Sequence, residues 1–309
     1  MISYPARFVD LSPARIEEAL EHIDPVFLDS PQFVAERLGA ELGREIVVKV
    51  ETMNPIGSFK GRGTTLLARE LDPERTWVCS TAGNFGQGLA YAARSSGAKV
   101  QVFVTADVPG GKVARMRAFG ARVDIAADSE AAAREYAAEG DDRLLILDGL
   151  EVAVAEGAGT IGVELARAGE LDTAVIQLGD GALITGIACW LKSVSPQTRI
   201  VGVCAAGAPA MAESFAAGRP VSVAGDGTIA TALAITDPVP ESVARMLALV
   251  DEVVLVDDND LREAMGVIAD SLGVLVEPAG AAGVAALRRH GDALAGDRVV
   301  LLLTGASGR

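Results

Sequence analysis

Short apolar runs recur along the chain, and alanine-rich segments of helical character separate them. Each run is apolar along its whole length and does not alternate with polar residues. Strands of that kind are buried on both faces, as in parallel sheets that helices cover on each side. The pattern predicts an α/β protein with mostly parallel sheets, whose strands are Ile46–Val50, Trp77–Cys79, Val100–Val104, Leu144–Leu147, Ala174–Leu178, Ile200–Cys204, Val253–Val256 and Val299–Leu303.

Polar residues and glycines mark the ends of the predicted helices. An Asp, Asn or Ser before a helical stretch supplies an N-cap, and a glycine after it supplies the C-cap. The predicted helices are Phe85–Ser96, opened by Asn84 or a neighbour and closed by Gly97; the stretch from Asp128-Ser129 to Glu139, closed by Gly140; and the stretch from Asp257–Asn259 to Gly273.

The chain of 309 residues is long enough to form two lobes with separate cores. We expect the chain to cross between the lobes near Glu70–Thr76 and again near Gly149–Gly159. The predicted division is a large domain of residues 1–75 and 155–309 and a small mobile domain of residues 76–154.

Composition narrows the classes of partner. A net charge of −15, without clustered Lys and Arg, argues against nucleic acid and anionic membranes as partners. No stretch approaches the ~20 uninterrupted apolar residues of a membrane-spanning helix, and the start of the chain does not have the sequence of a signal peptide. We therefore expect a cytoplasmic protein.

Cysteine and histidine usage limits the possible chemistry. Cys79, Cys189 and Cys204 are widely spaced in apolar runs, which is typical of reduced core residues and not of a disulfide or metal framework. The two histidines, His22 and His290, lie in or at the end of predicted helices. This pattern disfavours Ser-His-Asp and Cys-His mechanisms.

Glycine-rich or small-residue clusters occur at four places where we expect a loop between a strand and a helix. Small residues at a helix start let backbone N–H groups approach an anion closely, so four clusters favour a polyanionic ligand. The Gly157-x-Gly159-x-x-Gly162 run also matches the dinucleotide fingerprint, although the run before it, Val152–Glu156, is a poor strand. The clusters are Ser80–Gly88, Gly157–Gly162, Gly179–Gly186 and Glu277–Gly283.

Lys60 lies shortly after the strand Ile46–Val50, where Asn54-Pro-Ile-Gly predicts a turn and Ser58 a helix N-cap. The lysine would then occupy the first turn of a helix, where the dipole disfavours a cation and so favours the neutral amine. A neutral amine is what Schiff-base chemistry requires. The alternative is a surface lysine whose stem lies along the helix end.

Six blocks in chain order carry a resemblance to a known family. The chain resembles the tryptophan synthase β-like (fold type II) family of pyridoxal-phosphate enzymes, and within it the threonine/serine dehydratases, from about residue 45 to residue 309. The blocks are Ser58-Phe-Lys-Gly-Arg-Gly63, Ser80-Thr-Ala-Gly-Asn-Phe-Gly-Gln-Gly88, Glu156-Gly-Ala-Gly-Thr-Ile-Gly162, Gly179-Asp-Gly-Ala-Leu183, Glu277-Pro-Ala-Gly-Ala281 and Thr304-Gly305.

The resemblance implies two lobes with pyridoxal 5'-phosphate in the cleft between them, a small amino acid as substrate and a homodimer. It implies that Lys60 forms a Schiff base with the cofactor and moves protons at the substrate's α-carbon. The other cofactor-binding residues it implies are Asn84 at the ring hydroxyl, Gly179, Asp180, Gly181, Ala182 and Leu183 at the phosphate, Glu277, and Thr304 at the pyridine nitrogen; Ser80, Thr81 and Gly83 would bind the substrate carboxylate.

The sequence departs from the family pattern at several positions. Asp180 and Ala182 interrupt a phosphate loop that is normally a run of glycines, and Phe85 stands where the family often has histidine. Racemases of the family carry a serine where this chain has Ala82, so racemisation is disfavoured. Relatives that bind a divalent cation place acidic ligands in the stretch Val203–Met211, which has none here, so we expect no metal.

These observations predict a lyase that eliminates a β-substituent from a small amino acid such as threonine or serine, releasing a 2-oxo acid and ammonia. One alternative is a replacement synthase similar to threonine synthase or cysteine synthase. Another alternative is a binding protein that has kept the fold and lost the activity. We consider it because the Asp180 carboxylate would weaken phosphate binding at the expected site.

Overall fold

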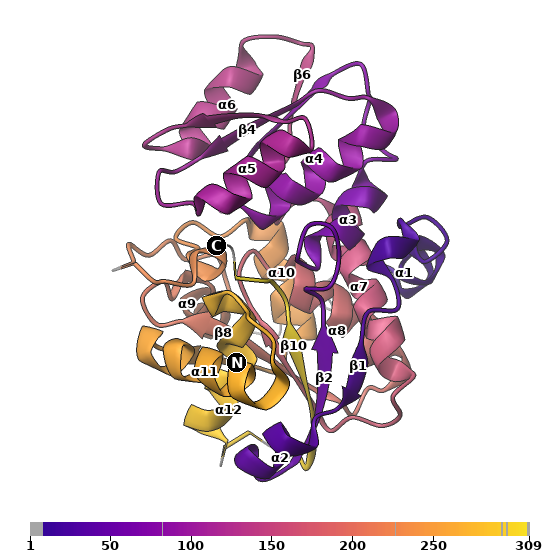
Figure 1. The fold of residues 1–309 in the computed structure, drawn as a ribbon, viewed down its shortest axis with the longest axis vertical. Coiled ribbons are helices and arrows are strands. Elements are labelled where there is room, and N and C mark those ends of the chain that lie inside the picture. Colours follow the sequence, from indigo (N-terminus) through magenta and orange to yellow (C-terminus); the bar gives the residue numbers. More distant parts are fainter. Residues whose placement is uncertain (1–8, 82, 226, 292, 295, 308–309) are drawn as a thin grey trace.

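The computed structural model describes residues 9–307 apart from residues 82, 226, 292 and 295. These residues form two sheets, which lie one above the other in Figure 1. The six-stranded sheet has the order β1-β2-β10-β7-β8-β9, and the four-stranded sheet has the order β5-β4-β3-β6. All neighbouring strands are parallel except β1 and β2.

The larger sheet contains β1 (Gln32–Val34), β2 (Glu45–Val50), β7 (Thr173–Gln177), β8 (Arg199–Ala205), β9 (Glu252–Val256) and β10 (Arg298–Leu303). The smaller sheet contains β3 (Thr76–Ser80), β4 (Val100–Val104), β5 (Arg122–Ile125) and β6 (Arg143–Leu145). The prediction of an α/β protein with mostly parallel sheets is confirmed, and each predicted strand overlaps an observed one.

The helices are α1 (Pro13–Ala19), α2 (Glu36–Leu42), α3 (Lys60–Leu67), α4 (Asn84–Ser96), α5 (Gly110–Ala118), α6 (Ser129–Ala138), α7 (Val152–Ala166), α8 (Ala182–Val194), α9 (Ala210–Ala217), α10 (Pro240–Leu249), α11 (Asp258–Leu272) and α12 (Ala282–His290). Short 3-10 helices are η1 (Pro25–Phe27), η2 (Thr231–Leu233) and η3 (Pro278–Ala281). The predicted helix ends are confirmed at α4 and α11, where Asp257 is an N-cap and Gly97 and Gly273 are left-handed C-caps. At α6 the predicted N-cap Asp128 is confirmed, but the C-cap is Glu139 in a right-handed conformation and not Gly140.

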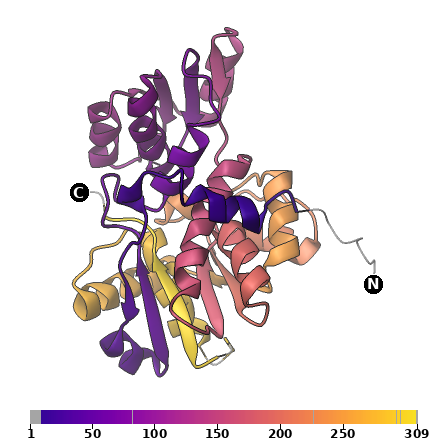
Figure 2. The same ribbon diagram turned by 90° about the vertical axis from the view of Figure 1, so that its right-hand side faces the viewer.

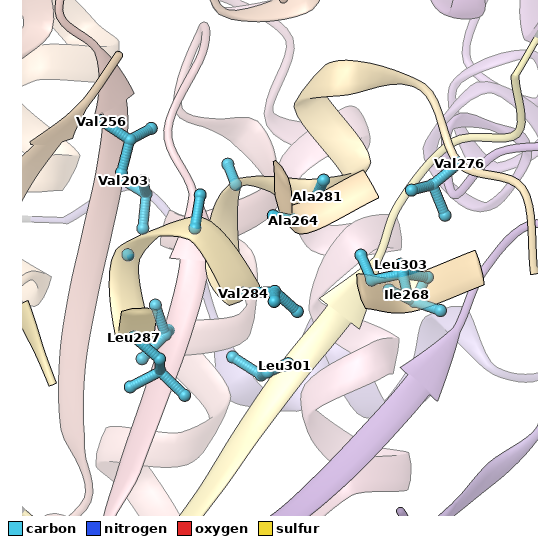
Figure 3. Close-up of a cluster of buried hydrophobic side chains, with 14 of the residues drawn as sticks. Val203, Val256, Ala264, Ile268, Val276, Ala281, Val284, Leu287, Leu301 and Leu303 are labelled. Atoms are coloured by element: carbon cyan, nitrogen blue, oxygen red, sulfur yellow. The ribbon is translucent and has the colours of Figure 1, made fainter. Parts of the chain in front are cut away.

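Helices cover both faces of the larger sheet. On one face, Ile268 of α11 and Val284 of α12 pack with Leu301 and Leu303 of β10 (Figure 3). On the other face, α7, α8 and α10 supply the apolar side chains. Figure 2 shows this arrangement from the side, with the yellow-orange helices α11 and α12 on one side of the sheet and the pink helices α7 and α8 on the other. Burial on both faces explains why these strands are apolar throughout.

Two expectations about local structure are wrong. Gly157, Gly159 and Gly162 lie inside α7, where no strand-to-helix loop exists, so the dinucleotide fingerprint lacks the turn that it requires. A Cβ atom on Gly157 would lie 2.6 Å from the Cα atom of Gly63, which shows that these glycines allow helices to pack closely. Ser58 is not the N-cap of α3, because that position is Phe59, which makes no side-chain capping bond.

Candidate active site

A cleft of about 450 Å³ lies at the carboxyl ends of strands from both sheets. Ser80 ends β3, Gln177 ends β7, Asp148 follows β6 and Thr304 follows β10, and all four line the cleft. Ligands of open α/β sheets bind at this edge, because the strand ends and the helix N-termini meet there. Every predicted site residue except Gly83 lines the cleft.

Lys60 is the first residue of α3, as the sequence predicted, and its amine reaches into the cleft. Its Nζ atom forms an ion pair with Asp148 and lies 5.0 Å from the ring centre of Phe59 and 5.7 Å from that of Phe85. The sequence analysis did not identify Asp148. The position directly after a predicted parallel strand could have indicated it, because such residues face the ligand edge of a sheet.

A buried cluster of charges anchors the helix that carries Lys60. Arg62 is fully buried and donates to Glu51 and Glu164, and Lys49 pairs with the same Glu164. These contacts join α3 to β2 and α7. The surrounding carboxylates raise the pKa of the Arg62 guanidinium, since their charges outweigh the opposing effect of burial. The ion pairs of Arg62 with Glu51 and Glu164 therefore fix the position of the first turn of α3.

Residues Gly179–Leu183 connect β7 to α8 and form the predicted phosphate loop. Gly181 has a φ of 97°, and Ala182 begins α8. Since the first N–H groups of a helix have no acceptor within it, the α8 N-terminus is suited to an anion. Gly179 packs closely against the backbone of the neighbouring loop, because a Cβ atom on Gly179 would overlap the carbonyl oxygen of Ala232.

Asp180 is the acidic residue of this loop. Burial, followed by the negative charge of Asp148, raises the pKa of the Asp180 carboxyl to about 6. Gly149, which follows Asp148 in the loop after β6, packs against Asp180, since a Cβ atom on Gly149 would lie 3.3 Å from that of Asp180. The carboxyl group of Asp180 therefore lies close enough to Asp148 and Lys60 to be affected by their charges.

The predicted carboxylate-binding residues surround the N-terminus of α4. Ser80 Oγ lies 2.8 Å from Ser129 Oγ, and the Gly83 N–H donates to Thr81 Oγ1 at 2.9 Å. Gly83 itself is not among the residues that line the cleft; its φ of 127° disfavours other residues, and a Cβ atom there would lie 2.5 Å from the Lys112 side chain. Ala82 lies outside the described residues.

A polar chain fixes Asn84 at the first turn of α4. The Asn84 amide donates to Glu277 Oε1 at 2.7 Å, and Lys112 Nζ donates to Glu277 Oε2 at 2.6 Å. Thr304 is buried beside this chain, and its carbonyl accepts from the Phe59 N–H at 3.1 Å. The structure thus brings Asn84, Glu277 and Thr304 together with Lys60, although they are far apart in sequence.

The remaining candidate groups lie away from this chemistry. Cys79, Cys189 and Cys204 are buried and free, as predicted, and burial raises the pKa of the Cys79 thiol to about 12. His290 ends α12, with Nε2 2.8 Å from the Leu255 carbonyl oxygen. Within the described residues, no group of three or more His, Cys, Asp or Glu side chains could hold a metal ion, and no helix could span a membrane.

A family model of pyridoxal-phosphate-dependent enzymes matches residues 23–305. The chain belongs to this family. It is 33% identical over 310 residues to the biosynthetic L-threonine dehydratase of Mycobacterium tuberculosis, covering 96% of this chain and 72% of that protein. It is 34% identical over 274 residues to the phenylserine dehydratase of Ralstonia pickettii, covering 86% and 83%. Maize serine racemase superposes with a TM-score of 0.88 at 26% identity, covering 97% of this chain and 94% of that one.

Membership makes pyridoxal 5'-phosphate the cofactor and the architecture that of fold type II, as the sequence predicted. The cleft of this family member fits the cofactor. An amine, an anion site at a helix N-terminus and a ring of polar side chains surround one space. Two buried acceptors that line it, Gln177 Oε1 and Asp148 Oδ1, lack a hydrogen-bond partner among the described residues. Such atoms are expected where a polar ligand belongs.

Proposed function

We propose that this protein eliminates the β-hydroxyl of a small amino acid such as threonine or serine, releasing a 2-oxo acid and ammonia. The observation that carries the proposal is the position of Lys60, whose amine lies in one cleft with the N-termini of α4 and α8. The similarity to two dehydratases supports elimination. An amine between two anion sites suits a substrate carboxylate on one side and a cofactor phosphate on the other.

The proposed roles follow from the geometry. Residues Gly179–Leu183 bind the phosphate through the α8 N-terminus, and Ser80 and Thr81, supported by Gly83, bind the substrate carboxylate. Asn84, Glu277 and Thr304 orient the ring of the cofactor. When bound, the cofactor withdraws electrons from the substrate's α-carbon and so acidifies its proton. Lys60 holds the cofactor and accepts that proton.

We further propose that residues 76–154 move as a small domain and exclude water from the cleft. All four strands of the smaller sheet come from this segment, which supports the division. The proposal also includes a homodimer in the cytoplasm, for which the support is the family resemblance. Light scattering on the purified protein tests the dimer.

The decisive experiment joins a spectrum with an activity panel. The purified protein should be yellow, and Lys60→Ala should lose the visible absorption band and all activity, because the variant has no amine to bind the cofactor. The wild type should form 2-oxo acid from serine, threonine or phenylserine. A yellow protein that forms none from the panel contradicts dehydration. A colourless protein that gains no band from added pyridoxal phosphate indicates the inactive binding protein.

Two other activities are distinguished in the same samples. The structural similarity to serine racemase makes inversion the second candidate, and chiral analysis of residual serine detects it. A replacement synthase would give a product that depends on an added nucleophile such as sulfide. Dehydration predicts the same 2-oxo acid with and without that nucleophile.

A further inference from the structure

Asp148 is the one carboxylate in direct contact with the Lys60 amine among the described residues. Its Oδ2 atom forms the ion pair, while its Oδ1 atom is buried and has no partner among the described residues. The side chains of Lys60 and Asp148 are 12% and 14% exposed, and both line the cleft. The proposed function assigns no role to Asp148, although its unpaired Oδ1 atom belongs to a residue that lines the cleft.

The reach of Lys60 locates Asp148 relative to the substrate. A base that takes the α-proton must lie within hydrogen-bond distance of it. The β-carbon lies one bond beyond the α-carbon, roughly 1.5 Å away. Because Asp148 contacts the same amine, its carboxylate is within reach of a substituent on the β-carbon. A hydroxyl there can form a hydrogen bond with the buried Oδ1 atom, which has no partner among the described residues, and the hydroxyl accepts the proton once Asp148 is protonated.

A departing hydroxyl needs a proton, and the cleft offers a source for it. Lys60 is the only Lys or Arg among the described residues that line the cleft, whereas Asp148 and Asp180 are acidic neighbours. Because Asp148 forms an ion pair with the Lys60 amine, a proton on that amine can pass directly to the carboxylate. Burial, followed by the negative charge of Asp148, raises the pKa of the nearby Cys79 thiol, so the thiol stays protonated and does not compete as a base.

We propose that Asp148 is the acid that protonates the departing β-hydroxyl, and that Lys60 resupplies its proton. This inference rests on the proposed dehydration. The Lys60 amine takes the α-proton and passes a proton to Asp148. The bond between the β-carbon and oxygen then breaks, the oxygen keeps the bonding pair, and Asp148 donates the proton to give water. The cycle needs no outside acid, and both side chains return to their starting state.

The test compares two leaving groups in the purified holoenzyme. Chloride leaves β-chloroalanine without a proton, whereas the hydroxyl of serine requires one. Asp148→Asn keeps the shape and removes the acid, so kcat for serine should fall about 10²- to 10³-fold, while kcat for β-chloroalanine should fall less than about tenfold. Asp251→Asn is the matched control, because Asp251 pairs with Lys192 outside the cleft, and it should leave both rates unchanged.

Equal losses for both substrates would overturn the inference and give Asp148 a positioning role only. Retained serine turnover would also overturn it and assign the acid to another group, such as the cofactor phosphate. If Asp148→Asn fails to hold the cofactor, Asp148→Ala with added formate decides, since formate should restore serine turnover more than tenfold and no rescue would reject the role. A yellow wild type that turns over β-chloroalanine but no β-hydroxy amino acid would instead reject the proposed function.

Discussion

The backbone and the side chain of Asp180 have opposite effects on phosphate binding. Its backbone belongs to the loop that we assign to the phosphate, while its carboxyl lies near Asp148. Burial and then the Asp148 charge raise the pKa of the Asp180 carboxyl from its ordinary 3.8 to about 6, so the folded protein favours the neutral form. Ionised Asp180 therefore destabilises the native state and repels a phosphate.

The sign of this effect gives a prediction for Asp180→Asn. A raised carboxyl pKa contributes stability that is fully present below about pH 4 and is lost as the pH rises through about 6. The variant should melt a few degrees above the wild type at pH 8 and at the same temperature at pH 4, measured by calorimetry on the cofactor-free protein. It should also bind pyridoxal phosphate more tightly at pH 8.

Asp172 provides a control of opposite sign. The N–H groups of Arg298 and Asp297 donate to its carboxylate and lower its pKa. Its stabilising effect is present at neutral pH and is lost on acidification, so Asp172→Asn should lower the melting temperature at pH 8. An Asp180→Asn variant that melts below the wild type at pH 8 would contradict the assignment.

Among single residues, the sequence predicts which ones line the site where they belong to local motifs. Lys60, Asn84, Thr304 and the loop Gly179–Leu183 were predicted from such blocks, and all of them line the cleft. Asp148 belongs to no block. It reaches Lys60 because β6 pairs with β3 and places the following loop against α3. That neighbour relation depends on strand order, which the local sequence does not encode.

Close helix packing explains the glycines at the element scale. The backbone of α8 approaches that of α7 so closely that a Cβ atom on Gly186 would overlap the Ala155 carbonyl oxygen and lie 2.8 Å from the Gly159 nitrogen. The glycines of α7 contact α3 in the same way, through Gly157 and Gly63. The helix that carries Lys60 is therefore positioned by backbone contact, as well as by the Arg62 cluster.

This packing predicts that Gly186→Ala destabilises the protein, although alanine favours helices. Overpacking costs about 1–3 kcal/mol or more, because backbone atoms cannot move aside as a flexible side chain can. Urea unfolding measures the loss. Gly266→Ala is the matched control: Gly266 lies in α11 with open space around its Cβ position, so the variant should gain about 0.5–1 kcal/mol. Equal effects at the two sites would contradict close packing at Gly186.

The two strands that the sequence analysis missed show where its pattern fails. In β1 only three residues are extended, and Phe33 and Val34 are more than 40% exposed at the edge of the larger sheet. In β5 the sequence Arg122–Ile125 is mixed, and it lies at the edge of the smaller sheet. An edge strand can do without apolar residues on both faces, and β1 and β5 do, so a rule that searches for continuous apolar runs does not detect them. The edge strands β6 and β9 were predicted because the runs Leu144–Leu147 and Val253–Val256 are apolar throughout.

At the scale of the whole molecule, buried polar contacts connect the two sheets and their helices. Lys112 of α5 and Asn84 of α4 both reach Glu277, which precedes η3 beside β10. In Figure 1, α4 and α5 lie with the smaller sheet, while β10 belongs to the larger one. Lys112 and Glu277 are 5% and 8% exposed, so solvent screens their attraction little. Glu277 thus couples the position of one half to the residues around Lys60.

This coupling predicts that Lys112→Met increases local opening of α4 and α5, the helices that lie with the smaller sheet. Methionine keeps the stem that packs against Gly83 but leaves Glu277 as a buried group without its cation, which is strongly destabilising. Hydrogen exchange followed by mass spectrometry should show faster exchange in α4 and α5, while β7 and β10 keep their protection. Lys192→Met breaks a more exposed pair with Asp251 and should leave both regions unchanged. Uniform loss of protection would indicate global unfolding, and unchanged exchange would show that Glu277 does not hold the two halves together.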